Sequence, residues 1–366
     1  MSRPRRAVLL AAALAATASC GGSDSGTSPS ASASSPPAGN GSARAYLDRI
    51  LDIMQTSSLR RLVIDWPSFR QKVNAVSPNP ATIADTYPAI REALGLLEDH
   101  HSLYRRADGV VIGNPNPRGS CTDVPAPVPQ VPARIGYVKI GAFSGTTEQA
   151  QQFALAVEQQ IRAADSTQVT GWIVDLRGNG GGNMWPMVAG VGAVLGDGDA
   201  GAFVGPTGLT TVWGYANGSS YSGAAAVHTI PNPYRLLRLD PKVAVLTDCY
   251  VASSGEATAV SFRGRPNTRT FGTNTYGLST SNQTINLSDG AQLFLTTAVF
   301  ADRTGRRYGD VLPPDEVTGG AVQTIQRAIE WLSAPGAVAV DTPRARLLHS
   351  SIFWRGVEQP GSSLGS

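Results

Sequence analysis

The chain has 366 residues, of which 42% are hydrophobic, and a formal net charge of +3 at pH 7. This length suffices for about two domains with a sizeable hydrophobic core. The charge is modest and of mixed sign, and no basic run is interleaved with aromatic residues, so nothing in the composition predicts a nucleic-acid partner.

The N-terminus has the pattern of an export signal. Three arginines at positions 3, 5 and 6 precede the apolar run 7–18, which is followed by Ser19 and Cys20. A positive segment, a short apolar segment and small residues at a cleavage site are typical of a secretory signal. The apolar run is too short to remain as a membrane-spanning helix. We therefore expect an exported protein, either secreted or held at the cell envelope.

Cys20 directly follows small residues, as the lipidated cysteine of bacterial lipoproteins does, although Thr17 replaces the usual apolar residue. This resemblance predicts a lipid anchor on Cys20 at the outer face of the membrane, with residues 1–20 as the signal peptide. The alternative is an ordinary secretory signal cut nearby. Residues 21–42 are almost entirely Gly, Ser, Ala, Thr, Pro and Asn, which predicts a disordered tether. Membrane contact is expected only through this anchor.

Residues 43–104 are predicted to form an N-terminal helical subdomain. Apolar residues recur at helical spacing within 47–54 and again within 90–97. Asp65 followed by Pro67 marks a helix start. The last helix runs into the sequence LEDHHS at 97–102. Residues 105–134 are rich in Pro, Gly and Arg and have no periodicity, so we expect a loop-rich connection.

The pattern then changes to strands alternating with helices, which predicts an α/β core over residues 135–334. Strands are expected at 135–140, 171–176, 242–247, 268–272, 283–287 and 292–300, and helices at 149–164, 186–195 and 321–332. Residues 335–366 are predicted to be a disordered tail. In an exported protein Cys121 and Cys249 could form a disulfide, or they could remain two separate buried thiols.

The most informative stretch is VASSGEA at 251–257, between the buried strand 242–247 and a helical pattern. At such a joint the backbone N–H groups of the helix point outward and stabilise a developing negative charge. A serine here is well placed to be a nucleophile, although a serine at a helix start is more often only a cap. Glu256 is expected to be an ordinary first-turn helix residue.

A serine nucleophile needs a base and donors for an oxyanion. Of four histidines, His100 and His101 are the better candidates because they lie at a helix end next to a loop; no lysine follows the serines. The glycines of DLRGNGGG at 175–182 follow a strand and can turn backbone N–H groups toward a ligand. A phosphate cradle is the alternative, but both phosphate-binding glycine motifs are absent. Asp175 and Arg177 are expected to pair and hold this loop.

Together these strings resemble the C-terminal processing (tail-specific) protease family, peptidase family S41. The resemblance covers IGYVKI at 135–140, VDLRGNGGG at 174–182, VAVLTDCYVASSGEA at 243–257, GTNTYGLST at 272–280 and PPD at 313–315. It implies a crotonase-like α/β spiral core and serine endopeptidase activity. By position in the motifs, Ser253 is the nucleophile, and the backbone N–H groups of Ser254 and of the Gly180–Gly181 region form the oxyanion hole.

One departure indicates the branch of the family. In the Ser–Lys members the lysine follows the nucleophile by 25 residues, and that position is Leu278 here. The chain resembles instead the tricorn-like and retinoid-binding-protein-like branch, and the connection 105–134 is too short to contain an inserted PDZ domain. This implies that His101 is the base, with His100 as an alternative base or tuning neighbour, and that Asp310 is a site carboxylate.

These features predict an exported serine-type peptidase that hydrolyses peptide bonds in a polypeptide substrate. Two alternatives remain open. The same fold could bind a ligand without catalysis, because a fold does not fix a function. The same site could also act as an esterase or amidase on small substrates. No metal or organic cofactor is implied by the sequence.

Overall fold

The computed structural model describes residues 40–116, 121 and 129–334. The predicted signal peptide with Cys20, residues 21–39 of the predicted tether, and the predicted tail after Ala334 lie outside the described residues. Within the described ranges, no helix has both the length and the apolar character needed to cross a bilayer.

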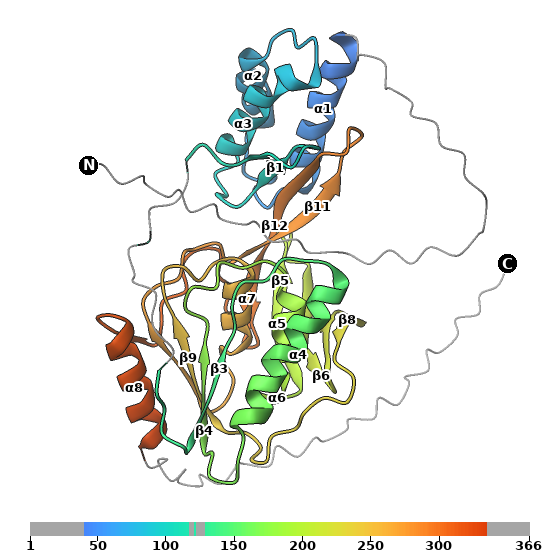
Figure 1. Cartoon of the computed structure of the whole chain (residues 1–366). Helices are drawn as coiled ribbons and strands as arrows, with labels where there is room; N and C mark the ends of the chain where they lie inside the picture. Colours follow the sequence, from blue (N-terminus) through green and yellow to red (C-terminus); the bar gives the residue numbers. More distant parts are fainter. Residues whose placement is uncertain (1–39, 117–120, 122–128, 335–366) are drawn as a thin grey trace, which may run out of the picture. The chain divides into compact units, whose positions relative to one another are not determined.

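The predicted N-terminal helices are present (Figure 1). They are α1 (Asn40–Ser57), α2 (Trp66–Val76), the 3-10 helix η1 (Ile83–Thr86) and α3 (Tyr87–Leu96). The first residues of α1, 40–42, lie inside the stretch predicted to be tether. Asp65 caps α2 as predicted, accepting a hydrogen bond from Ser68 N–H at 3.4 Å.

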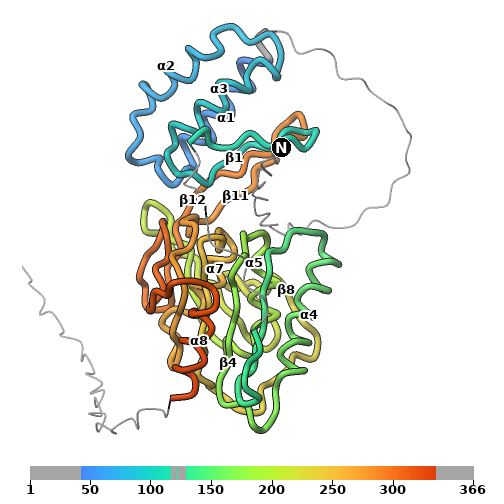
Figure 2. The backbone as a smooth tube through the Cα atoms, turned by 60° about the vertical axis from the view of Figure 1, so that its left-hand side comes forward, coloured from blue at the N-terminus to red at the C-terminus, as the bar shows by residue number. Residues whose placement is uncertain are grey.

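The helical unit completes its core with a strand from much later in the chain. Strand β12 (Gln292–Asp302) pairs with β1 (Leu103–Arg105) near its start and with β5 (Gly198–Val204) near its end. Leu293 and Leu295 of β12 are fully buried in the same apolar cluster as the helices. Figures 1 and 2 show β11 and β12 as a long hairpin next to β1. The helices precede the core in the sequence, but in the folded protein strand β12 belongs to both.

The described strands form two sheets. The larger has the order β2-β1-β12-β5-β6-β7-β8, with β11 paired to β12. Its remaining strands are β2 (Val111–Ile112), β6 (Thr210–Ala216), β7 (Ser219–Ser222), β8 (Ala225–Thr229) and β11 (Thr280–Asn286). Strand β2 falls within the predicted loop-rich connection. The antiparallel strands within 198–229 were not predicted, because they are rich in Gly, Ala, Ser and Thr and show little apolar alternation.

The smaller sheet is parallel, with the order β13-β10-β9-β4-β3. Its strands are β3 (Ile135–Lys139), β4 (Gly171–Asp175), β9 (Lys242–Thr247), β10 (Thr268–Gly272) and β13 (Glu316–Val317). All but the two-residue β13 lie where strands were predicted. The α/β class preceded by a helical unit is thus confirmed.

Helices cover both faces of this parallel sheet. Alternate residues of β9 point to opposite sides: Val243 and Val245 join the cluster that includes α4, α5 and α7, whereas Ala244 and Leu246 join the cluster with α8. This burial on both faces explains why the strand reads as a continuous apolar run. The helices are α4 (Thr147–Ala164), α5 (Met184–Gly190), α6 (Gly192–Leu195), α7 (Ser254–Ser261) and α8 (Ala321–Ser333).

The predicted single helix at 186–195 is divided into α5 and α6 by Val191, whose ψ of 2° departs from helical geometry. Gly192, which begins α6, lies directly against Tyr215: an added Cβ would come within 2.0 Å of the ring. The close approach of this aromatic ring from β6 is a tertiary contact that the local apolar pattern does not encode.

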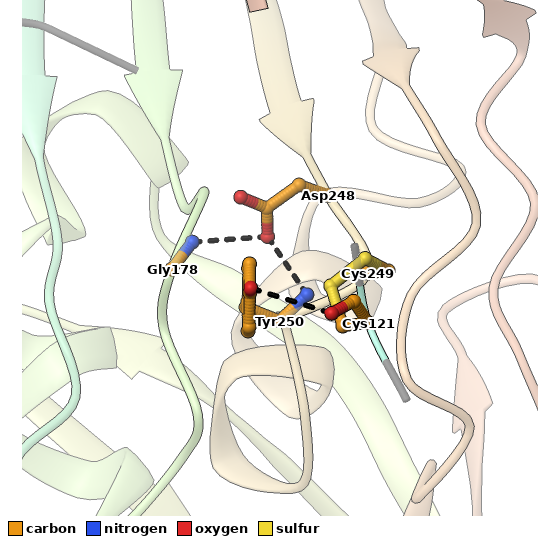
Figure 3. Close-up of a disulfide and its surroundings, with 5 residues drawn as sticks. All are labelled: Cys121, Gly178, Asp248, Cys249 and Tyr250. Atoms are coloured by element: carbon orange, nitrogen blue, oxygen red, sulfur yellow. Dashed lines mark hydrogen bonds between the residues drawn. A yellow bond between two sulfur atoms is a disulfide. The ribbon is translucent and has the colours of Figure 1, made fainter. Parts of the chain in front are cut away.

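A disulfide joins Cys121 and Cys249, with 5.4 Å between their Cα atoms, which resolves the two alternatives left by the sequence (Figure 3). The adjacent Tyr250 hydroxyl donates a hydrogen bond to the Cys121 carbonyl at 3.4 Å. The two cysteines are separated by 128 residues. Closing so long a loop restricts the unfolded chain strongly, which in the chain-entropy account stabilises the fold by about 4–5 kcal/mol.

We expect replacement of both cysteines by serine to lower the free energy of unfolding by about 2–5 kcal/mol, because the unfolded chain regains the freedom of the closed loop. Denaturant titration of the wild type and of the Cys121→Ser/Cys249→Ser variant measures this difference. Dithiothreitol should destabilise the wild type and leave the double variant unchanged. Equal midpoints for all four samples would contradict the expectation.

Candidate active site

Ser253 stands at the turn between β9 and α7, at the N-cap position of the helix. Its backbone angles are φ 52° and ψ −117°, a conformation that glycine adopts readily and serine does not. Strain of this kind costs on the order of 1–3 kcal/mol and persists only where the surrounding structure imposes it. The side chain is 6% exposed. A strained serine on a strand-to-helix turn is the local geometry of a nucleophile elbow.

Backbone strain is concentrated around the predicted site. Among the described residues, seven non-glycine residues have a positive φ. Four of them are Asn or Asp, which tolerate this conformation in turns: Asn217, Asn232, Asp240 and Asn267. The other three are Glu98, His100 and Ser253, which flank or contain the predicted base and nucleophile. Such outliers cluster at functional sites more often than elsewhere.

The glycine loop lies directly against the serine because β4 and β9 are parallel neighbours that end at the same edge of the sheet. Asn179 O accepts a hydrogen bond from Ala252 N–H at 3.0 Å, and Ser254 Oγ donates to Gly182 O at 2.6 Å. A Cβ added to Gly181, whose φ is +104°, would lie 2.9 Å from Ser253 Cβ. Only glycine fits this approach.

The amide N–H of Gly181 donates to the side chain of Asn179, with 3.0 Å between Gly181 N and Asn179 Oδ1. As the first residue of α7, Ser254 has a backbone N–H without an acceptor inside the helix. Of the predicted oxyanion-hole donors, Ser254 N–H is therefore oriented by the helix start, whereas Gly181 N–H has a partner within its own loop. Gly180 lies between Asn179 and Gly181 in the same turn.

Asp175 and Arg177 form the predicted pair at the base of the glycine loop. The guanidinium donates two parallel hydrogen bonds to the carboxylate, Nε to Oδ1 at 2.8 Å and Nη2 to Oδ2 at 2.6 Å. Burial by itself would raise the pKa of Asp175, but the Arg177 bonds and charge outweigh it and hold that pKa below its ordinary value. Both side chains are buried and hydrogen-bonded, and their pairing fixes the point where the loop leaves β4.

Asp248, at the end of β9, links the two loops (Figure 3). One oxygen, Oδ1, accepts hydrogen bonds from Gly178 N–H and from Tyr250 N–H, each at 3.0 Å. The glycine loop and the serine segment are thus held by the same carboxylate. The disulfide at Cys249 ties this junction to Cys121.

His101 is buried, with 6% of its surface exposed, and the hairpin of β11 and β12 holds it. Its Nδ1 lies 2.7 Å from the hydroxyl of Thr280, and its carbonyl accepts a hydrogen bond from Asn282 Nδ2 at 3.0 Å. Asp99 fixes the backbone by accepting from His101 N–H at 3.0 Å. Burial lowers the pKa of His101 to about 4, so the imidazole is neutral at physiological pH.

The other two predicted site residues are His100 and Asp310. His100 Nδ1 is 3.0 Å from the carbonyl of Asn116, outside the contacts that hold His101. Asp310 is exposed; its Oδ1 accepts from Val311 N–H at 2.8 Å, and its carbonyl accepts from the hydroxyl of Ser279, the residue before Thr280. The orienting contact on His101 thus comes from a hydroxyl, Thr280.

A cleft beside Ser253 is lined by residues of the serine segment and of the hairpin. Ser253 and Ser254 line it with Thr280 and Asn282 from the hairpin that holds His101. Its apolar lining consists of Met184, Trp185, Phe203 and Phe300. The rings of Trp185 and Phe203 meet edge to face, with 6.2 Å between their centroids. The cleft therefore combines polar groups, including those of the serine segment, with aromatic rings suited to an apolar group.

The sequence analysis missed the residues that the hairpin contributes. Thr280 lies inside the string GTNTYGLST, which provided a signal, but Asn282 and Phe300 belong to strands whose register relative to the helical unit was unknown. Glu256 lies in the first turn of α7, as predicted, but its complete burial and its several hydrogen bonds were not foreseen.

A strained serine on a strand–helix turn with a glycine loop packed against it is the local arrangement found in hydrolases with a serine nucleophile. Residues 134–318 match the model of peptidase family S41. The nisin-resistance protein of Lactococcus lactis subsp. lactis is 30% identical over 271 residues, which are 74% of this chain and 80% of that protein. The chain belongs to peptidase family S41, as its motifs predicted.

Solved structures support the same fold. A lipoprotein from Streptococcus agalactiae is similar with a TM-score of 0.62 and 23% identity, over 79% of this chain and 96% of that one. A candidate peptidase from Parabacteroides merdae ATCC 43184 is similar with a TM-score of 0.53 and 16% identity, over 81% and 99% of the two chains. The predicted crotonase-like core with a preceding helical unit is confirmed as the fold of the family.

The depressed pKa of His101 makes a prediction for stability. Between the ordinary value of 6.5 and about 4, the unfolded chain binds a proton at this position and the folded chain does not. The contribution of His101 to stability is therefore complete above pH 6.5 and lost as the pH falls toward about 4. The difference in unfolding free energy between the wild type and His101→Gln, measured by denaturant titration, should shift against the wild type over this interval.

The glutamine variant is the control, because it cannot titrate and retains a polar side chain of similar reach. Other groups that titrate in the same range act in both proteins and cancel in the difference. A difference that stays constant from about pH 7 to about pH 4.5 would show that the buried imidazole is not neutral as described.

Proposed function

We propose that the protein is a serine peptidase in which Ser253 is the nucleophile and His101 the general base. One observation carries the proposal: the strained Ser253 lines the same cleft as Thr280, the residue whose hydroxyl contacts His101 Nδ1. With the Nδ1 proton donated to Thr280, the lone pair lies on Nε2, which is the form that can accept the serine proton.

The reaction follows from these assignments. Ser253 Oγ attacks the peptide carbonyl carbon while its proton passes to His101 Nε2. The tetrahedral intermediate breaks its C–N bond, and the imidazolium gives that proton to the leaving amine. Water then hydrolyses the acyl-enzyme by the same proton transfers, releasing the acid and the free serine. A pKa of about 4 makes His101 a weak base but a ready proton donor once charged.

The negative oxygen of the intermediate needs donors. We assign one to the backbone N–H of Ser254, which the start of α7 leaves without an intrahelical acceptor. The second comes from the Gly180–Gly181 turn, either by Gly181 N–H turning from Asn179 Oδ1 to the substrate oxygen or from Gly180. The close approach of Gly181 to Ser253 supports this assignment.

The central test is a Ser253→Ala variant assayed beside the wild type on unfolded polypeptides, with products identified by mass spectrometry. The variant should lose activity by a factor of about 10³ or more, because the covalent step disappears. Ser219→Ala, in the β7 hairpin, is the control for the loss of a serine elsewhere. Equal cleavage by Ser253→Ala and wild type would remove the proposal.

The aromatic residues that line the cleft favour substrates with an apolar side chain next to the bond that is cut. The name of the Lactococcus lactis relative associates that protein with nisin resistance. Nisin is therefore a sensible substrate to include in the assay. If the wild type cleaves nisin and Ser253→Ala does not, the similarity to the Lactococcus lactis relative would extend from fold to function.

We assign the orientation of the imidazole to Thr280, whereas the role of Asp310 as a site carboxylate stays a prediction. Thr280→Val removes the hydroxyl and keeps the shape, so kcat should fall about 10–100-fold, as for a misoriented base. Thr280→Ser should retain most of the activity. Asp310→Asn, assayed in parallel, decides between the two residues: a larger loss with Asp310→Asn than with Thr280→Val would reverse the assignment.

We further propose that the protein is exported and anchored by a lipid on Cys20. The signal-like N-terminus, a disulfide, which forms in oxidising compartments, and the structural likeness to a lipoprotein support export. In a bacterial host grown with an alkyne fatty acid, the full chain should become labelled and Cys20→Ser should not. Equal labelling of both, or label in neither with secretion into the medium, would contradict the anchor.

A further inference from the structure

Glu256 is buried beneath the nucleophile turn, with none of its surface exposed. It is the third residue of α7, and such a residue commonly reaches back to the backbone N–H of the cap residue. Here Oε2 accepts from Ser253 N–H at 2.8 Å. This bond holds the amide of the one residue in the turn whose φ is positive, so it opposes relaxation of the strained serine.

The same carboxylate also holds a second segment, Thr275–Leu278. Oε2 accepts from Leu278 N–H at 2.8 Å, and Oε1 accepts from Gly277 N–H at 3.0 Å and from the Thr275 hydroxyl at 2.5 Å. All four partners are donors, three of them fixed backbone amides. Only an ionised carboxylate accepts at every one of these positions. Burial raises the pKa of Glu256 and these four bonds lower it, and the two effects together leave it at about 7.

The second segment leads directly into the residue that holds the histidine. Thr280 N–H donates to Leu278 O at 2.7 Å, and Thr280 Oγ1 lies 2.7 Å from His101 Nδ1. In the other direction, Tyr276 N–H donates to Val251 O at 2.8 Å, within the serine segment. A chain of short contacts therefore runs from Ser253 through Glu256 and Leu278 to Thr280 and His101.

We propose that Glu256 is the positioning residue of the site: its carboxylate sets the backbone of Ser253 and, through Thr275–Leu278 and Thr280, the imidazole of His101. This inference rests on the proposed function, since it assigns Ser253 and His101 their roles. Glu256 does not touch the substrate. Its effect is on the relative placement of nucleophile and base, which governs the chemical step far more than substrate binding.

Glu256→Gln is the decisive variant, because it keeps the size of the side chain and turns one acceptor oxygen into an NH2 group that faces donors. We expect kcat to fall about 10–100-fold, with KM within about twofold, as for a misplacement of reacting groups. The full chain is used, and kcat is expressed per active site titrated with a fluorophosphonate. That normalisation removes any loss due to unfolded protein, which a merely structural role would produce.

Glu158→Gln is the matched control. Glu158 is also a buried glutamate that accepts a backbone N–H, from Tyr234 at 3.0 Å, but it lies in α4 and contacts neither catalytic segment. Its kcat per titrated site should equal that of the wild type. If Glu256→Gln does not fold, Thr275→Val takes its place, with Thr275→Ser, which keeps the hydroxyl, expected to restore activity.

The outcomes separate the two proposals. A wild type whose cleavage does not depend on Ser253 overturns the proposed function. A Ser253-dependent wild type with an equally active Glu256→Gln, or with Thr275→Val as active as Thr275→Ser, overturns the positioning role alone. A selective loss of kcat in Glu256→Gln, absent from Glu158→Gln, supports it.

Discussion

The parallel pairing of β4 and β9 is the constraint on which the site depends. Asp175 lies opposite Leu246 in this register, so both strands end at the same edge of the sheet. The chain then leaves β4 as a glycine loop and β9 as the serine turn, and the two loops have no room to separate. The Asp248 carboxylate accepts a hydrogen bond from one backbone N–H in each loop, and Asn179 O accepts a hydrogen bond from Ala252 N–H. A change of one residue in this register would move every one of these contacts.

His101, the proposed base, is held by a different part of the chain. His101 comes from the end of the helical unit, yet its ring and its backbone are held by Thr280 and Asn282 of β11. The hairpin of β11 and β12 pairs with both β1 and β5, so one continuous strand connects the helical unit to the larger sheet. His101 and Ser253 are far apart along the chain, but a short series of hydrogen bonds through Thr280, Leu278 and Glu256 connects them in the folded protein.

Much of this arrangement was predictable from the sequence, and the reason lies in local rules. The buried strand 242–247, the Asp65 cap and the Asp175–Arg177 pair each follow from short patterns that the structure reproduces. The motif order indicated the family, which the comparisons confirm. The four hydrogen bonds of Glu256 were not predictable. Its partners at 275–278 are distant in sequence, and two of the three are backbone amides, which carry no residue signature. The same applies to strands β5 to β8, whose small residues gave no period.

The shared core of helices and hairpin has a consequence for how the chain acquires its structure. The apolar cluster around α1 and α3 includes Ala291, Leu293 and Leu295, which are synthesised long after the helices themselves. Until that late segment arrives, the faces of α1 and α3 that it covers remain open to water and to other chains. The N-terminal helices therefore lack part of their apolar core until the last quarter of the chain has been made. Until then, their uncovered apolar faces favour aggregation of the newly made chain.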